Sequence, residues 1–254
     1  MKISAAIITF NEEDKIKRCI ESLKGIVDEI IVVDSHSTDK TQEIAKDQGA
    51  VIFEQKFLGH VQQKNLAIEK TNHEWVLSLD ADEALSEDLK DSLKQLKNSP
   101  LDHKAYGFNR KTHYVERWIH HCGWYPDKKV RLFHKSFAKW AGQNPHDIIE
   151  VRSGESTHWL KGDLLHYSYD SISDHIDQTN RFTTIAAKEA YARGKRSSFL
   201  GPFFRAGLKF LRDYFFKRGF LDGRYGLVIC TINSLSAFLK YMKIYEIEKN
   251  RFID

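Results

Sequence analysis

The carboxylates of Asp80 and Asp82 directly follow an apolar run and are the residues best suited to chemistry. Thr9 and Asn11 follow an earlier apolar run, and Asp34 ends another. Because the carboxyl ends of parallel strands meet at one edge of a sheet, we expect these side chains to converge there. Hard divalent cations take carboxylate oxygens and bridge phosphate oxygens. The spacing therefore predicts a site in which a divalent cation holds a diphosphate.

The acidic residues also have structural interpretations. A D-x-D pair is expected about once by chance in a chain with this much Asp, and such a pair can be a solvated turn. Asp34 could instead cap a turn or helix in the segment VDSHSTD. The sequence contains neither G-x-G-x-x-G nor G-x-x-x-x-G-K-[ST], which disfavours a dinucleotide site and a P-loop. The loop after the first apolar run is not glycine-rich, which disfavours a nucleotidyltransferase that would cradle a triphosphate.

The elements that must position these residues alternate along the first 80 residues. Short apolar runs predict strands, and amphipathic segments between them predict helices that begin near Asn11, Lys40 and Val61. This alternation is typical of a parallel α/β sheet. Residues 104–116 and 128–135 predict further strands at a mixed edge. The strands predicted in the first part are residues 3–9, 29–34, 51–54 and 75–79.

Charge and aromatic residues are distributed unevenly. Residues 1–100 hold 13 Lys and Arg against 19 Asp and Glu, whereas residues 181–254 hold 15 against 6. In the segment FFRAGLKFLRDYFFKR, Phe204 and Leu208 fall on one helical face while Arg205 falls on another. This pattern predicts a basic amphipathic helix at an anionic membrane surface. The alternative is a helix packed on the rest of the protein with its basic face exposed. No nucleic-acid-binding motif accompanies the charge, so we expect no nucleic acid partner.

Composition restricts the class of protein further. With 254 residues, 41% of them hydrophobic and 29% charged, the chain is globular and not disordered. Cys19, Cys122 and Cys230 are widely spaced and predict neither a disulfide framework nor a zinc knuckle, so a reducing compartment is expected. The N-terminal apolar run is too short for a signal peptide. The longest candidate span, Leu227–Phe238, is about 12 residues long and interrupted by polar residues, so no spanning helix is expected.

Four segments, in this order, resemble family 2 glycosyltransferases with a GT-A fold: ITFNEE, VVDSHSTDKT, QQKNLAI and WVLSLDADE. The segments GWYPDKKVRLFHK, NPHDIIEV and GFLDGRYGL resemble the branch that adds sugars to the lipopolysaccharide core, of the β-1,4-glucosyltransferase type. The resemblance covers almost the whole chain. It implies an α/β fold, a Rossmann-like mixed sheet with helices on both faces, followed by a C-terminal basic, aromatic-rich helical region.

The resemblance also implies roles for individual residues. Thr9, Asn11 and Glu12 would line the nucleotide pocket, and Asp34 would contact the uracil. Lys64 matches a basic position near the base or diphosphate. Asp80 would lie by the ribose, and Asp82 would bind Mg²⁺ or Mn²⁺ that bridges the diphosphate. The residues that the resemblance places at the nucleotide-sugar are Thr9, Asn11, Glu12, Asp34, Lys64 and Asp80.

An inverting transfer needs a base that takes the proton of the acceptor hydroxyl. Family members carry an acid after a His or Glu, and Asp147 matches that position here. The nearer relatives have Glu at this position, so Glu150 is the alternative base, and Asp147 could also cap a helix or strand end. His166 matches a late histidine that sometimes binds the same cation, and an ordinary core histidine is the other interpretation.

Aromatic side chains between residues 118 and 125 are candidates for binding the acceptor sugar. Exposed Trp and Tyr rings commonly stack on sugars, which points to Trp118, Trp124 and Tyr125, with core packing as the alternative. His120, His121 and Cys122 are adjacent and cannot all point at one ion from a regular strand, so they predict no metal site.

The sequence and the resemblance together predict an inverting, metal-dependent transferase. It would move a hexose, glucose by resemblance, from a UDP-sugar to a lipopolysaccharide-core or other lipid-linked acceptor at the cytoplasmic face of the inner membrane. The alternatives are transfer to a polyprenyl phosphate and a non-catalytic GT-A-fold membrane tether. The expected domains are a catalytic domain of residues 1–180, with a nucleotide-sugar half to residue 100 and an acceptor half after it, and a membrane-associating extension of residues 181–254.

Overall fold

The computed structural model of the protein describes residues 1–143 and 146–250. Asn144 and Pro145, which belong to the segment NPHDIIEV, lie outside the described residues. The chain forms two compact units. The sheet unit comprises Met1–Lys111 and Asp127–Tyr167, and the helical unit comprises Thr112–Pro126 and Ser168–Asp254. The boundary predicted between residues 180 and 181 lies inside the helix Ile172–Ala192.

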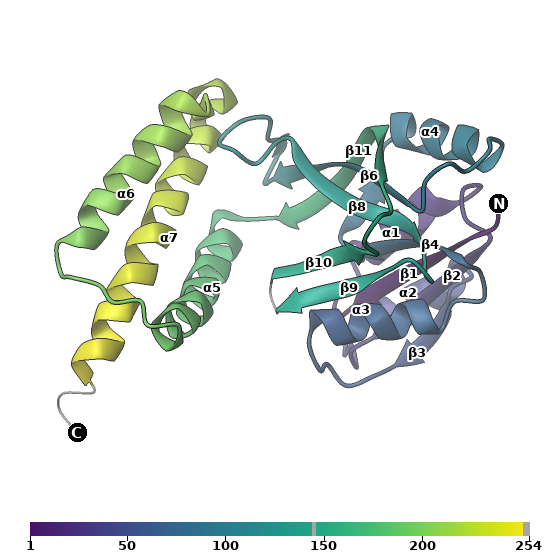
Figure 1. Ribbon diagram of the computed structural model, residues 1–254, viewed down its shortest axis with the longest axis horizontal. Coiled ribbons are helices and arrows are strands. Elements are labelled where there is room, and N and C mark those ends of the chain that lie inside the picture. Colours follow the sequence, from purple (N-terminus) through teal and green to yellow (C-terminus); the bar gives the residue numbers. More distant parts are fainter. Residues whose placement is uncertain (144–145, 251–254) are drawn as a thin grey trace. The chain divides into compact units, whose positions relative to one another are not determined.

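The sheet unit contains a mixed sheet with the strand order β3-β2-β1-β4-β8-β6-β11-β5 (Figure 1). The first four strands pair in parallel, and β8 then pairs antiparallel with β4 and with β6. This arrangement confirms the predicted α/β class with a mixed edge. The strands are β1 (Ile3–Thr9), β2 (Glu29–Asp34), β3 (Val51–Glu54), β4 (Trp75–Asp80), β5 (Glu83–Leu85), β6 (Ala105–Tyr114), β8 (Asp127–His134) and β11 (Thr157–Tyr169).

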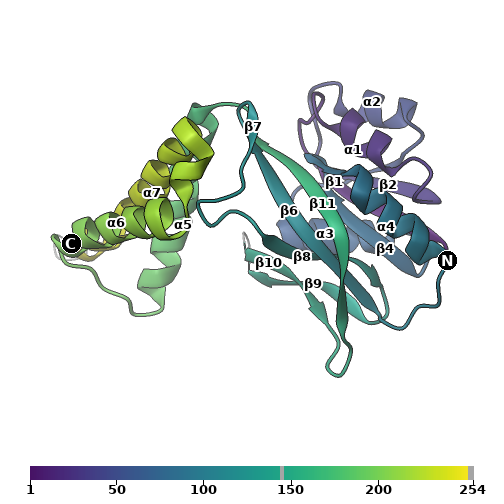
Figure 2. The same cartoon turned by 90° about the horizontal axis from the view of Figure 1, so that it is seen from above.

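Helices cover both faces of this sheet, as expected (Figure 2). One face packs against apolar side chains of α1 (Ile16–Leu23), α2 (Thr41–Asp47) and α4 (Glu87–Lys97). The other face packs against α3 (His60–Glu69) and a separate hairpin of β9 (Ala138–Gln143) and β10 (His146–Val151). The central strands β1 and β4 are almost fully buried between these layers, which explains their continuous apolar sequences.

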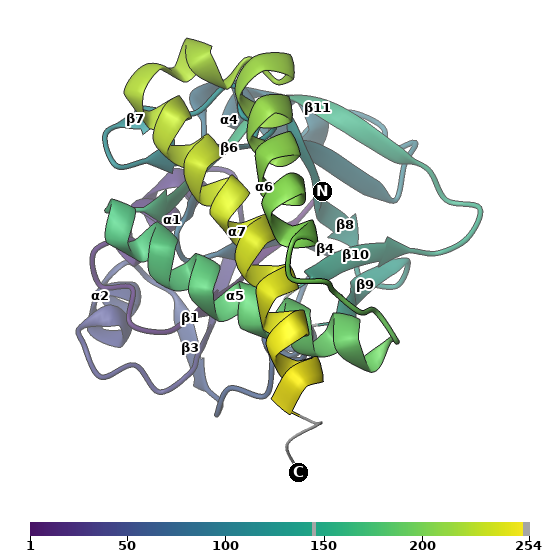
Figure 3. The same ribbon diagram turned by 90° about the vertical axis from the view of Figure 1, so that its left-hand side faces the viewer.

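The helical unit consists of three long helices and two short turns. Figure 3 shows α5 (Ile172–Ala192) crossing α7 (Gly223–Asn250), with α6 (Gly201–Leu211) alongside α7. The short turns η1 (Arg212–Phe216) and η2 (Gly219–Asp222) connect α6 to α7. The two-residue strand β7 (Arg117–Trp118) also lies in this unit. The buried carboxylate of Asp222 accepts the backbone N–H of His121 at 2.8 Å and so fixes the segment that precedes Trp124.

The expectation of no spanning helix stays a prediction, because length and composition alone do not show that a helix crosses a membrane. The helix Gly219–Lys249 is long and apolar enough to do so by length and composition. The polar residues that interrupt the apolar run lower its average hydropathy but do not end the helix. Only 22% of its most apolar window is buried within the protein.

Candidate active site

A chain of alternating charges lies at the carboxyl end of β4. The Lys64 ammonium is 2.9 Å from an oxygen of Asp80 and 2.8 Å from an oxygen of Asp147. Lys64 comes from α3, Asp80 ends β4, and Asp147 comes from β10. Lys64 is almost fully buried, so its charge depends on these two carboxylates for stabilisation. The structure thus brings together three of the residues that the sequence singled out.

The charge chain continues through two residues that the sequence analysis missed. Arg131 of β8 contacts Asp80 at 3.4 Å and Glu83 at 2.8 Å. Glu83 also accepts the backbone N–H of Asp80 at 3.0 Å. The ring of Trp140 lies beneath both cations, 4.2 Å from the Lys64 ammonium and 5.0 Å from the Arg131 guanidinium. This buried, largely satisfied network holds the Asp80 carboxylate in one position.

Asp80 is held in its ionised form. Burial acts to raise the pKa of this carboxyl, but Lys64 and Arg131 outweigh burial and hold the pKa well below its usual range. Asp80 therefore carries a negative charge at neutral pH.

Asp82 and His166 form a second pair beside this network. The Nε2 atom of His166 lies 3.1 Å from an Asp82 oxygen, and antiparallel pairing of β11 with β5 places His166 opposite Glu83. Burial acts to raise the pKa of Asp82, but His166 outweighs it and lowers that pKa. Among the described residues, no group of three or more His, Cys, Asp or Glu side chains could hold a metal by itself.

A two-residue donor set fits a cation that a diphosphate helps to hold. Mg²⁺ usually binds one or two carboxylates and takes its remaining ligands from substrate phosphates and water. The Nδ1 atom of His166 is buried, and within the described part of the chain it has no hydrogen-bond partner. Asp82 and His166 are therefore the residues that would hold such a cation.

Two loops at the same sheet edge contain the remaining predicted nucleotide residues. The Oδ1 atom of Asn11 accepts the Thr38 backbone N–H at 2.8 Å, and the Glu12 backbone N–H donates to Thr41 Oγ1 at 2.8 Å. The hydroxyl of Thr9 is buried and lacks a partner among the residues the structure describes. These contacts join the loop after β1 to the loop after β2.

Asp34 has the turn-capping geometry that we considered as its alternative role. Its carboxylate is fully buried and accepts the Ser37 backbone N–H at 2.8 Å and the Gln42 side-chain amide at 2.7 Å. The loop's own donors thus engage this carboxylate, and contact with a uracil stays a prediction.

A pocket of about 480 Å³ opens next to the charge chain. Lys64, Asp80 and Asp147 lie on its wall together with Arg131 and Trp140. The rest of the lining comes from β6, β8, β10 and β11, and consists of Arg110, Lys128, Lys129, Val130, Ile148, Ile149 and Trp159.

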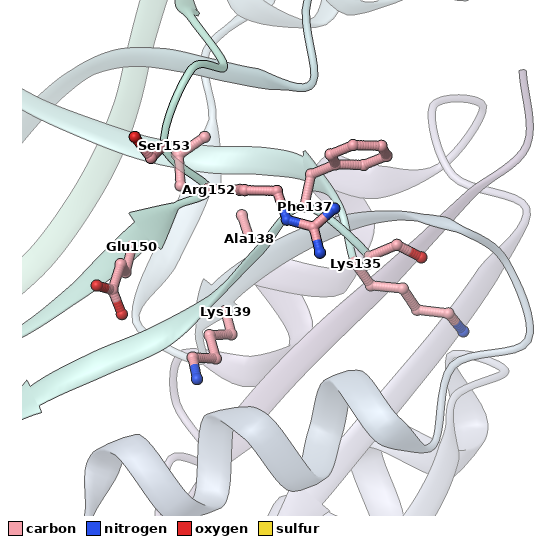
Figure 4. A pocket seen from close by; sticks show the side chains of 9 residues that line it. Lys135, Phe137, Ala138, Lys139, Glu150, Arg152 and Ser153 are labelled. Carbon is pink, nitrogen blue, oxygen red and sulfur yellow. The ribbon is translucent and has the colours of Figure 1, made fainter.

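Glu150, the alternative base, lines a different pocket. That pocket measures about 330 Å³ and lies beside the base of the β9–β10 hairpin, where Figure 4 shows Glu150 among Lys135, Lys139 and Arg152. Glu150 does not line the pocket that contains Asp80 and Lys64, whereas Asp147 does. The geometry therefore favours Asp147 over Glu150.

The predicted acceptor residues Trp124 and Tyr125 belong to the helical unit. The Trp124 ring packs 5.8 Å from that of Tyr114 and 5.6 Å from that of Tyr169, within an aromatic cluster. Tyr125 lies 6.0 Å from His120. Trp124 thus has the packing role that we considered as the alternative, and contact of either residue with an acceptor stays a prediction.

Sequence reasoning missed Glu83, Arg131, Trp140 and Trp159. Glu83 stands one residue after Asp82, and Arg131 lies within the quoted segment GWYPDKKVRLFHK, so position in the matched segments could have pointed to both. Nothing in the local sequence around Trp140 or Trp159 indicates a site, because β9 and β11 reach it only through the tertiary fold.

Comparison with known proteins assigns the chain to a family. Residues 4–155 match the model of glycosyl transferase family 2. An uncharacterized glycosyltransferase of Rickettsia typhi is 34% identical over 97% of this chain and 87% of its own length. The lipopolysaccharide core biosynthesis glycosyltransferase LpsC of Rhizobium meliloti is 29% identical over 97% of this chain and 93% of its own length. The crystal structure of TarS residues 1–349 of S. aureus aligns over 99% of this chain and 92% of that chain, with a TM-score of 0.44 and 14% identity. The protein with the charged site at the end of β4 is a member of glycosyl transferase family 2.

Proposed function

We propose that this glycosyltransferase is an inverting, metal-dependent enzyme that moves a hexose, glucose, from a UDP-sugar to a lipopolysaccharide-core or other lipid-linked acceptor. The observation that carries the proposal is the convergence of Asp80, Lys64 and Asp147 on one pocket, next to Asp82 and His166. The likeness to LpsC over nearly the whole chain supports the acceptor class.

The donor side of the reaction uses Asp82 and His166. A divalent cation, when bound there, neutralises the negative charge that develops on the leaving nucleoside diphosphate. Asp82 is ionised, and the His166 ring lies 3.1 Å away, so the pair would offer a carboxylate oxygen and, once the ring is free of its proton, an imidazole nitrogen to such a cation. Lys64 adds a positive charge that is already fixed in place before the sugar arrives.

The acceptor side uses Asp147. Its carboxylate accepts the proton of the acceptor hydroxyl as that hydroxyl attacks the anomeric carbon from the side opposite the diphosphate. The 2.8 Å contact with Lys64 fixes the carboxylate at the pocket wall, which limits the geometries from which a hydroxyl can approach.

The helical unit supports an association with the cytoplasmic face of the inner membrane. Several large apolar side chains on α6, η1 and η2 are exposed, with Phe216 exposed by 83% and Phe204 by 73%. Arg205, Lys209 and Arg212 lie on the same segment. Apolar side chains that enter the headgroup region, with cations that meet anionic lipid, hold amphipathic helices at a bilayer surface.

The test is a donor-hydrolysis and transfer assay on the purified full chain. A panel of UDP- and GDP-sugars is offered with Mn²⁺, Mg²⁺ or EDTA to the wild type, Asp147→Asn and a surface control, Asp91→Asn. We expect one UDP-hexose to be turned over only with a cation, and transfer to a lipopolysaccharide-core acceptor to fall by about 100-fold or more in Asp147→Asn alone. Turnover that is equal with EDTA and with either cation would contradict the proposed metal dependence.

A further inference from the structure

We infer that the pocket beside Asp147 binds an anionic group, a phosphate or a carboxylate, that the acceptor sugar carries in addition to the hydroxyl that attacks. This inference rests on the proposed transferase function and specifies the chemistry of its acceptor. It comes from the part of the pocket formed by Arg110, Lys128, Lys129 and Trp159, where Arg110 also lies 3.7 Å from Glu83 of the charge chain.

Most cations around this pocket already have carboxylate partners. Arg110 contacts Asp127 at 2.9 Å, and Lys129 contacts the same carboxylate at 3.0 Å. Lys128 differs, because within residues 1–143 and 146–250 no carboxylate lies within ion-pair distance of its ammonium. The pocket therefore has a positive charge that the described chain leaves uncompensated, and an anion could pair with it.

An aromatic surface lies directly beside this charge. The Lys128 ammonium stands 5.0 Å from the centre of the Trp159 ring, which is 41% exposed. Gly107 of β6 makes room for this ring, since a Cβ atom at that position would lie 2.3 Å from it. A flat aromatic ring held against the sheet, next to an ammonium that no carboxylate of the described residues pairs with, suits a sugar that bears an acidic group.

The pocket lies where the donor residues Lys64 and Asp80 meet Asp147. Its lining includes Asp147, the residue placed at the attacking hydroxyl, and strands on the far side of β4 from β1. Thr9, Asn11 and Asp34 do not line it, whereas Lys64 and Asp80, which are also expected at the nucleotide-sugar, share its wall with Asp147. We therefore place the anion at the Lys128 part of the pocket, on the molecule that approaches Asp147.

The second basic pocket offers a matched control in the same unit. Lys139 is an exposed lysine of β9 on the wall of the pocket that Figure 4 shows. It has no part in the charge chain. Replacing Lys139 removes one positive charge from the sheet unit without touching the pocket beside Asp147.

The experiment is a tryptophan-fluorescence titration of the full chain with glucose 6-phosphate, glucose and inorganic phosphate. It compares the wild type with Lys128→Met, Lys128→Arg and the control Lys139→Met, after thermal melts have shown that each variant is folded. We expect the wild type to bind glucose 6-phosphate about tenfold more tightly than glucose. The preference should fall to about threefold or less in Lys128→Met and persist in Lys128→Arg and Lys139→Met.

Three results would overturn the inference. The first is equal binding of glucose and glucose 6-phosphate by the wild type. The second is an equal loss of the preference for glucose 6-phosphate in Lys128→Met and Lys139→Met. The third is transfer of labelled sugar to undecaprenyl phosphate in an acid-labile linkage, since the anion would then be the nucleophile itself. UDP-sugar hydrolysis that persists in the wild type alongside any of these results would leave the transferase assignment intact.

Discussion

Replacing Lys64 with methionine should destabilise the sheet unit, because this buried lysine bridges two carboxylates. Methionine keeps most of the apolar stem and removes the ammonium that lies 2.9 Å from Asp80 and 2.8 Å from Asp147. Both carboxylates would then face each other across the pocket wall without the cation between them.

The size of the effect follows from burial and from the partners that remain. Loss of one partner of a buried ion pair typically costs about 3–5 kcal/mol. The Asp80 and Asp147 side chains keep 26% and 14% exposure, and Asp80 retains Arg131 at 3.4 Å. Water and Arg131 therefore offset part of the loss, and we expect the free energy of unfolding to fall by about 2–3 kcal/mol.

Thermal and urea unfolding of the full chain measure this change, with Lys94→Met as the control. Lys94 is exposed, and within the described residues its ammonium pairs with Asp91 of the same helix at 3.5 Å and with no other carboxylate, so its loss should cost less than about 0.5 kcal/mol. Adding Asp147→Asn to Lys64→Met should restore at least half of the lost stability, because a neutral amide needs no cation. A Lys64→Met variant as stable as Lys94→Met would refute the bridging role.

Three further predictions concern other parts of the protein. Burial lowers the pKa of His175 from 6.5 to about 4. Between these two pH values the unfolded chain binds a proton that the folded chain does not. The free energy of unfolding therefore falls as the pH falls through this range. The wild type should lose about 2 kcal/mol between pH 7 and pH 5 from this group, and His175→Gln should lack that loss in unfolding titrations. Gly107→Ala should lower the free energy of unfolding by about 1–3 kcal/mol, because its Cβ would clash with the Trp159 ring. Adding Trp159→Ala should remove this loss in unfolding measurements, and a loss that persists in the double variant would contradict the clash as its source. Phe204→Ser and Phe216→Ser should each weaken co-sedimentation with phosphatidylglycerol vesicles by about tenfold, and unchanged sedimentation would count against the proposed membrane face.

The strands of the first 80 residues were predictable from their apolar runs, and α2 and α3 begin within a residue of the expected positions. The helix expected to begin near Asn11 was misplaced: α1 begins at Ile16, and Asn11 instead accepts the Thr38 backbone N–H. The runs at β1, β2, β3 and β4 match the observed strands to within a residue. The proximity of Lys64 and Asp80 follows from the same pattern, since α3 packs beside the strand that Asp80 ends. Local sequence thus suffices for Lys64 and Asp80, whereas His166 reaches Asp82 only through the pairing of β11 with β5.

The acceptor half was harder to predict, because long-range pairing builds it. Trp159 reaches the pocket only because β11 lies next to β6, and a glycine 52 positions earlier in the chain leaves space for its ring. Local sequence cannot show that these residues lie side by side. The sequence analysis chose Trp124 as an acceptor residue instead, and its ring packs within the helical unit.

The sequence analysis also underestimated the length of the apolar C-terminal helix. A search for uninterrupted apolar residues stops at Thr231 and Asn233, although a helix averages polar and apolar positions around its axis. The helix Gly219–Lys249 passes through both residues without a break.

The measurement that tests the central claim most directly is calorimetric binding of UDP to the full chain with Mn²⁺ or with EDTA. It compares the wild type with Asp82→Asn and with the surface control Asp91→Asn. We expect UDP to bind only with Mn²⁺, and Asp82→Asn to weaken that binding by about tenfold or more while Asp91→Asn leaves it unchanged. Binding of UDP that is equal with Mn²⁺ and with EDTA, or equal in all three proteins, would contradict a cation held by Asp82 at the end of β4.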